Sequence, residues 1–172
     1  MEKAARLLLG AASGGVLGLV LSGMFRAGAW VAAGVTVIAA AGLALLSSRL
    51  RPSGPPPPPR SVWAGICGGT AILIALAVLF MQSFYIQSAT LQGKQPELPL
   101  PIWPVSRSLL WITVLVAGLG MLSGMAGWME LQRERGKYRG GSFIATGFLA
   151  CVSSIALAAA CYTMGYGLPF LR

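Results

Sequence analysis

Residues 62–85 read VWAGICGGTAILIALAVLFMQSFY, a stretch that contains no Lys, Arg, Asp or Glu. An α-helix needs about 20 apolar residues to cross the roughly 30 Å of hydrocarbon in a bilayer. Backbone groups in lipid must be hydrogen-bonded within the segment, so a helix is the expected state of such a run. The stretch therefore predicts a membrane-spanning helix.

Four similar runs share the chain with this one. The five predicted helices are Leu7–Phe25, Gly28–Ser48, Val62–Tyr85, Ser108–Met129 and Ser142–Met164. Arg26 is the only charged break between the first two, which predicts a hairpin with a very tight turn. We expect an all-α integral membrane protein in which residues 1–172 form one membrane domain, a bundle of five transmembrane helices.

The first run also has an alternative interpretation. Lys3 and Arg6, the apolar stretch and the small residues around Gly28 are typical of a secretory signal, whose removal would leave four helices. Against cleavage, the apolar stretch exceeds the usual 7–15 residues, and Arg26 crowds the cleavage point.

Basic residues in short loops predict the orientation, because cytoplasmic loops carry an excess of Lys and Arg. With five helices, one side holds Lys3, Arg6, Arg49, Arg51, Arg60, Arg133, Arg135, Lys137 and Arg139, and the other holds Arg26, Lys94, Arg107 and Arg172. Nine against four places the N-terminus inside and the C-terminus outside. The net charge of +9 is thus a topological signal, and we expect no nucleic-acid partner.

The composition lacks the residues on which most active sites depend. The sequence has no His, no Asp and no Asn, and it has four Glu. Catalytic triads and His-ligated or Asp-rich metal sites therefore cannot form, and the three cysteines form no C-x-x-C motif. We expect a protein that is not an enzyme, with no catalytic, metal or cofactor site.

Small residues recur at four-residue spacing along several helices. Close backbone approach at such residues holds helices together in lipid, where the hydrophobic drive between them is weak. The positions are Gly10, Gly14, Gly18 and Ser22 in the first helix, Gly65 and Gly69 in the third, and Gly120 and Gly124 in the fourth. They predict packing within one bundle, or, for the first helix, contact with another chain.

Two loops carry prolines. The cytoplasmic linker 49–61 contains five consecutive prolines and predicts a stiff spacer. The external loop 86–107 holds Pro96, Pro99, Pro101 and Pro104, which predict an extended segment. We expect its apolar side chains to lie on the outer membrane face or against a partner. The predicted contact residues are Pro99, Pro101, Ile102 and Trp103.

The second cytoplasmic segment follows the fourth helix. Glu130 and Glu134 stand one turn apart, and Glu130 can pair with Arg133 or with the neighbours of Arg135 at helical spacing. We expect the fourth helix to continue a turn into the cytoplasm. Arg133, Arg135, Lys137 and Arg139 predict orientation and contact with anionic lipid.

Residues 80–135 resemble the small membrane subunit of tripartite (TRAP-type) transporters. The resemblance rests on Gln87-Ser88, on the stretch 97–103 (ELPLPIW), and on the glycine-bearing helix with its basic end. It implies a four-helix, non-catalytic scaffold beside a large transport subunit. The predicted fifth helix and the absence of an acidic pair after Trp30 depart from that family.

The sequence thus predicts a small accessory subunit that scaffolds or stabilises a larger complex in the bacterial inner membrane. Its partners would be the lipid bilayer and a larger integral-membrane subunit. The narrower alternative is the small subunit of a tripartite transporter. A self-contained homo-oligomeric channel or carrier is the alternative from another class, although ionisable residues, the usual mark of an ion path, are absent from the helix cores.

Overall fold

The computed structural model describes residues 2–24, 29–49, 56–95, 100–134, 137–138 and 141–166. These residues form five α-helices: α1 (Glu2–Met24), α2 (Ala29–Arg49), α3 (Pro59–Leu91), α4 (Trp103–Arg133) and α5 (Gly141–Tyr166). The prediction of an all-α fold with five helices is confirmed.

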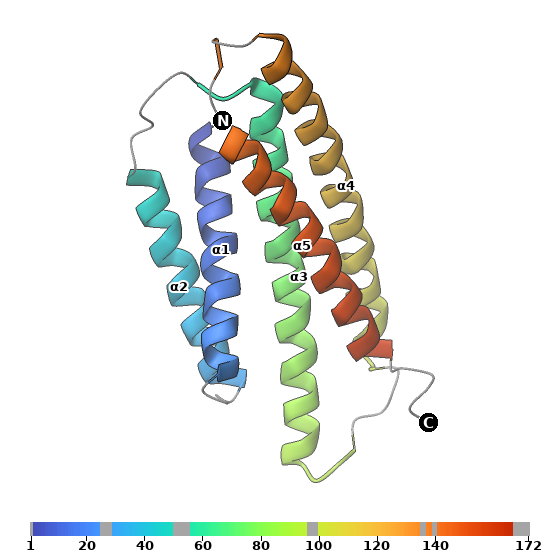
Figure 1. Ribbon diagram of the computed structural model, residues 1–172. Coiled ribbons are helices and arrows are strands. Elements are labelled where there is room, and N and C mark those ends of the chain that lie inside the picture. Colours follow the sequence, from blue (N-terminus) through green and yellow to red (C-terminus); the bar gives the residue numbers. More distant parts are fainter. Residues whose placement is uncertain are drawn as a thin grey trace.

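Successive helices run in alternate directions along one bundle, and α3 lies at its centre (Figure 1). α3 contacts all four other helices, whereas α2 packs mainly on α1 and touches α3 only slightly. The molecule therefore consists of a three-helix unit, α3–α5, to which the α1–α2 hairpin is attached through α1.

Four helices are long and apolar enough to cross a membrane: α1 over Glu2–Val20, and α3, α4 and α5. In α2 the stretch Gly34–Ser47 is also apolar, over a shorter length. These helices indicate an integral membrane protein. The number of segments that actually span the membrane and the side that each end faces stay predictions.

Small residues fill the interior and large apolar residues cover the outside. Buried positions include Ala64, Ala71, Ala75 and Ala117, while the exposed large hydrophobic residues include most of the outer face of α4. Lipid tails solvate large apolar side chains, so a membrane bundle gains stability from close backbone contact at small residues. This distribution fits a bundle surrounded by lipid.

Every helix extends beyond the apolar core predicted for it on at least one side. α3 continues from Tyr85 to Leu91, and α4 begins at Trp103 and not at Ser108. The sequence analysis delimited the part of each helix that needs lipid, whereas hydrogen bonding continues as far as the backbone permits. The predicted continuation of α4 past Met129 is confirmed, because α4 ends at Arg133.

Prolines begin helices here where they were expected only to shape loops. Pro59 occupies the first turn of α3 and Pro104 the first turn of α4. A proline at this position loses no helical hydrogen bond, because the first N–H groups have no intrahelical partner. The linker 49–61 and the loop 86–107 are therefore each shorter than predicted.

The C-terminal end of α3 is closed by a glycine turn. Gly93 has a φ of 69°, and the Lys94 amide donates to the Ala89 carbonyl at 3.0 Å. This is the arrangement in which a left-handed glycine satisfies the last carbonyl groups of a helix.

The alternating helices bring the predicted cytoplasmic residues to one end of the bundle, here called the basic end. The starts of α1, α3 and α5 and the ends of α2 and α4 lie there (Figure 1). Its described cationic side chains are Lys3, Arg6, Arg60, Arg133 and Lys137, while Lys94 and Arg107 lie toward the opposite end.

Candidate functional site

The small residues of α1 form its contact with α2. A Cβ atom at Gly14 would lie 2.6 Å from the Ala39 carbonyl carbon, and one at Gly18 would lie 2.5 Å from the Thr36 Cα. Gly10 faces Ser47, whose hydroxyl donates to the Arg6 carbonyl at 2.9 Å. These three glycines pack against α2 of the same chain, so they are not available for contact with another chain. The Ser22 side chain lies outside the described residues.

The glycines of α3 and α4 lie between helices in the same way. A Cβ at Gly65 would meet Leu9 of α1 and Phe143 of α5, and one at Gly69 would meet Leu8 backbone and side-chain atoms. These two positions seat α3 against its neighbours.

Gly120 and Gly124 seat α4 on α3. A Cβ at Gly120 would lie 2.6 Å from the Cys151 Sγ and 2.8 Å from the Cys67 Cβ, and one at Gly124 would lie 3.5 Å from the Ala64 Cβ. Gly120 thus lies where α3, α4 and α5 meet. The cysteines there are free thiols.

The outer loop does not present its apolar residues as predicted. Trp103 is buried, with its ring 4.9 Å from that of Tyr162 and 5.7 Å from that of Tyr166. Leu100 is buried too, and its amide donates to the Gly165 carbonyl at 3.1 Å.

The assignment of Trp103 as a partner contact is therefore corrected: it anchors the loop to the end of α5. The aromatic residues of α5 supply this anchoring surface, which local sequence could not indicate. Pro101 is exposed and Ile102 half-buried, and Pro99 lies outside the described residues.

A charged pocket of about 220 Å³ lies at the basic end, between the start of α3 and the end of α4. Its lining residues are Arg60, Ala126, Met129, Glu130, Arg133 and Glu134. The Glu130 Oε2 atom is buried and has no hydrogen-bond partner among the described residues.

The predicted Glu130–Arg133 ion pair is not formed. The ion pairs in the described part of the chain are Arg6–Glu2 at 2.7 Å and Lys137–Glu134 at 2.8 Å. Glu134 raises the pKa of Lys137 by accepting its hydrogen bond. Glu134 is thus occupied by Lys137, while the Glu130 carboxylate faces Arg60 and Arg133 across the pocket without an ion pair. Arg135 and Arg139 lie outside the described residues.

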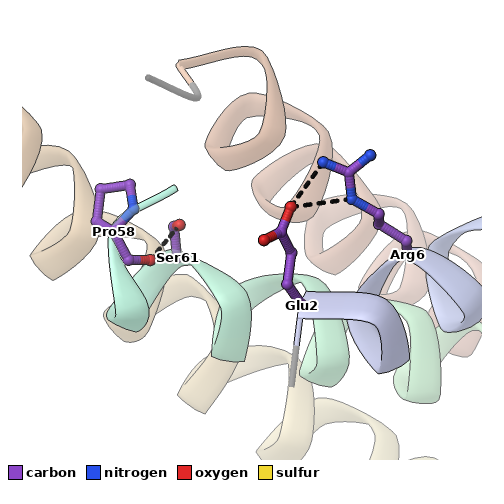
Figure 2. A network of polar contacts seen from close by, with 4 residues as sticks. All are labelled: Glu2, Arg6, Pro58 and Ser61. Atoms are coloured by element: carbon purple, nitrogen blue, oxygen red, sulfur yellow. Dashed lines mark hydrogen bonds and ion pairs between the residues drawn. The ribbon is translucent and has the colours of Figure 1, made fainter. Parts of the chain in front are cut away.

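Local polar contacts order the starts of α3 and α1 at the basic end. The Ser61 hydroxyl donates to the Pro58 carbonyl at 2.6 Å, and Arg6 donates to Glu2 through Nε and Nη2 (Figure 2). Gly127 lets α4 approach closely here, because a Cβ there would lie 2.9 Å from the Ser61 amide nitrogen. The close approach of Gly127 to Ser61 places the start of α3, which carries Arg60, next to the last turn of α4.

An apolar groove of about 590 Å³ adjoins the charged pocket along α4 and α5, and the two share Ala126 and Met129. The groove is lined by Leu122, Gly124, Met125, Ala126, Trp128, Met129, Ile144, Ala145 and Phe148. A polar pocket and an apolar groove thus lie side by side on α4, with Ala126 and Met129 at their common border.

Sequence analysis missed two buried polar side chains near the opposite end. Gln82 of α3 and Ser106 of α4 are both 0% exposed, and neither has a hydrogen-bond partner among the described residues. Gln82 lies against Gly165 and Trp103, since a Cβ at Gly165 would contact both. Gln82 could have been noticed as the one amide within the apolar run 62–85.

Comparison with protein-family models, with curated proteins and with solved structures gave no match. The resemblance to the small subunit of tripartite transporters therefore stays a prediction.

Proposed function

We propose that this chain is a non-catalytic integral-membrane subunit that stabilises a larger inner-membrane complex. The observation that carries the proposal is the one-sided attachment of α2, which packs mainly on α1 and leaves a broad apolar face uncovered.

Among the side chains that the structure describes, the large residues on the uncovered face of α2 are all apolar. Val31, Val37, Ile38, Leu45 and Leu46 are all exposed, and Ile38 reaches 74%. Gly34 and Gly42 lie on the outside too, with no atom within 4 Å of a Cβ placed at either. Bulky side chains beside small ones provide a surface onto which another transmembrane helix can pack.

The outer face of α4 supplies a second such surface. Trp111, Leu115, Leu119, Leu122, Met125 and Met129 are exposed and follow one another at three- or four-residue spacing. That spacing keeps them on one side of a helix. A face of this kind can contact lipid, whose tails solvate large apolar side chains, or another transmembrane helix.

The hydroxyl groups within the helices argue against a self-contained channel. Thr113, Ser123 and Thr146 donate to carbonyl groups of their own helices, four residues earlier, at 2.8–2.9 Å. Such back-bonding satisfies the hydroxyl without lining a polar path. A pore through one copy would need polar groups that converge, and these three hydroxyls instead serve their own backbone.

The proposed orientation has the basic end in the cytoplasm, according to the charge rule for short loops. The bacterial inner membrane is the proposed location. A small subunit of a tripartite transporter is the narrower form of the proposal, and it rests on the stretch 97–103.

Photochemical cross-linking tests the proposal. A photoreactive residue at Ile38 should form an adduct with one larger integral-membrane chain in native membranes. The same residue at buried Ile72 is the matched control and should give none. Adducts only at multiples of 17.9 kDa would contradict the subunit proposal and favour the homo-oligomeric alternative.

A further inference from the structure

We propose that the charged pocket and the apolar groove together bind one phospholipid whose headgroup carries a primary amine, as phosphatidylethanolamine does. This inference is independent of the proposed subunit role. It rests on the charges of Arg60, Glu130 and Arg133 and on the position of the groove directly beside the pocket, with Ala126 and Met129 lining both.

The two arginines provide a site for the phosphate. Arg60 and Arg133 line the pocket, and neither forms an ion pair with another described residue. Guanidinium groups bind phosphate oxygens through paired N–H donors. Arg60 also lies in the first turn of α3, where the helix dipole favours an anion.

Glu130 provides a site for the amine. Its Oε2 atom is buried without a hydrogen-bond partner, and a buried carboxylate oxygen left unpaired is costly. Glu130 lies in the last turn of α4, where the helix dipole favours a cation. The pocket therefore favours an anion at the start of α3 and a cation at the end of α4. A zwitterionic headgroup, which carries both charges, fits this arrangement.

The pocket has a size suited to a headgroup. Liquid water occupies about 30 Å³ per molecule, so 220 Å³ equals the space of several waters. A phosphate joined to a short amine fits within a space of this order.

The apolar groove identifies the ligand as a lipid and not as a free phosphate ester. It begins at Ala126 and Met129, which also line the pocket, and continues past Trp128 and Phe148. Its lining is almost entirely apolar and suits an acyl chain. Trp128 lies at the level where indole rings favour the membrane interface.

The test uses the purified full chain, stripped of lipid and titrated with defined lipids in detergent. Unfolding is followed with a thiol-reactive dye, since Cys151 and Cys161 are buried and free. Phosphatidylethanolamine should raise the unfolding temperature. Phosphatidylcholine should bind about tenfold more weakly, because its trimethylated nitrogen cannot donate a hydrogen bond to Glu130. Soluble glycerophosphoethanolamine, which lacks acyl chains, should give little shift.

Variants separate the two halves of the headgroup. Glu130→Gln should remove the preference for phosphatidylethanolamine over phosphatidylcholine while leaving phosphate-dependent binding. Arg60→Gln combined with Arg133→Gln should weaken both lipids, and Arg107→Gln at the opposite end should change neither.

Four results would overturn the inference. They are equal shifts from all phospholipids, a stronger shift from phosphatidylglycerol, an unchanged preference in Glu130→Gln, and native mass spectra that show a second copy of the chain in place of a bound lipid.

Discussion

At the scale of single residues, the packing of the helices depends on the positions of the glycines, which have no side chain. Glycines at contact positions have no room for even one carbon atom, as at Gly14 and Gly120, whereas Gly42 and Gly118 lie in open space. The same residue type thus has opposite roles at positions that the sequence does not distinguish.

Gly14→Ala should destabilise the α1–α2 hairpin, because the added Cβ would meet the Ala39 backbone at 2.6 Å. Overpacking of this kind costs about 1–3 kcal/mol. Gly42→Ala is the matched control, since its Cβ meets nothing within 4 Å, and it should be neutral or stabilising by up to about 1 kcal/mol. Unfolding in mixed micelles measures both. Equal effects of the two substitutions would contradict the packing described for α1.

Gln82→Met should leave the protein as stable as before or make it more stable. Met has a similar length and removes two buried polar atoms that have no partner among the described residues. Relief of an unsatisfied buried group is worth about 1–3 kcal/mol. The same unfolding assay applies, with Gln82→Glu as the contrasting, destabilising variant. A clear loss of stability in Gln82→Met would show that the amide is hydrogen-bonded.

At the scale of elements, α2 stands apart from the other helices. It has one close neighbour, α1, and its hydroxyl at Ser47 reaches across to the Arg6 carbonyl. Helices with few tertiary contacts open at lower free energy than the global unfolding.

Amide exchange in detergent should therefore be faster in α2, over residues 34–47, than in the central part of α3, over residues 68–78. The physical reason is the difference in packing: α2 packs on α1 and only slightly on α3, whereas α3 contacts all four other helices. Hydrogen–deuterium exchange with mass spectrometry gives both rates in one experiment. Equal protection of the two segments would show that α2 is held by more than α1.

Element boundaries illustrate what the sequence could predict. Runs of apolar residues sufficed to place all five helices, because lipid leaves the backbone no other state. The ends were missed where the helix continued into the interface, as at Tyr85–Leu91. Trp103 was predicted to contact a partner because an apolar residue in a proline-rich loop is expected to be exposed. Its contacts with Tyr162 and Tyr166 depend on the position of α5, which the sequence of the loop does not indicate.

The residues of the charged pocket could likewise be predicted only in part from the sequence. Helical spacing indicated Glu130 with Arg133, and it could not indicate Arg60, which lies seventy residues earlier. Arg60 reaches the pocket only because α3 and α4 run antiparallel and approach at Gly127 and Ser61.

At the scale of the whole molecule, the charges define the axis of the bundle. Alternating helices gather Arg60, Arg133 and Lys137 at one end, with Lys94 and Arg107 toward the other. The orientation proposed from this asymmetry makes a direct prediction.

Lys94→Cys should react with a membrane-impermeant thiol reagent added outside intact spheroplasts, and Arg133→Cys should react only after the membrane is opened. Lys94 and Arg133 are both exposed, so a difference in their labelling reports the side of the membrane on which each residue lies. The unsubstituted chain is the control for background: Cys151 and Cys161 are buried, and any labelling of the half-buried Cys67 is subtracted. The reverse labelling pattern would refute the orientation.

The mass of the intact particle tests the central claim most directly. The chain, extracted from native membranes in mild detergent, should be measured by native mass spectrometry without prior separation of its partners. The account predicts one 17.9 kDa chain in a fixed ratio with a larger integral-membrane protein. Particles that contain only copies of this chain would contradict it.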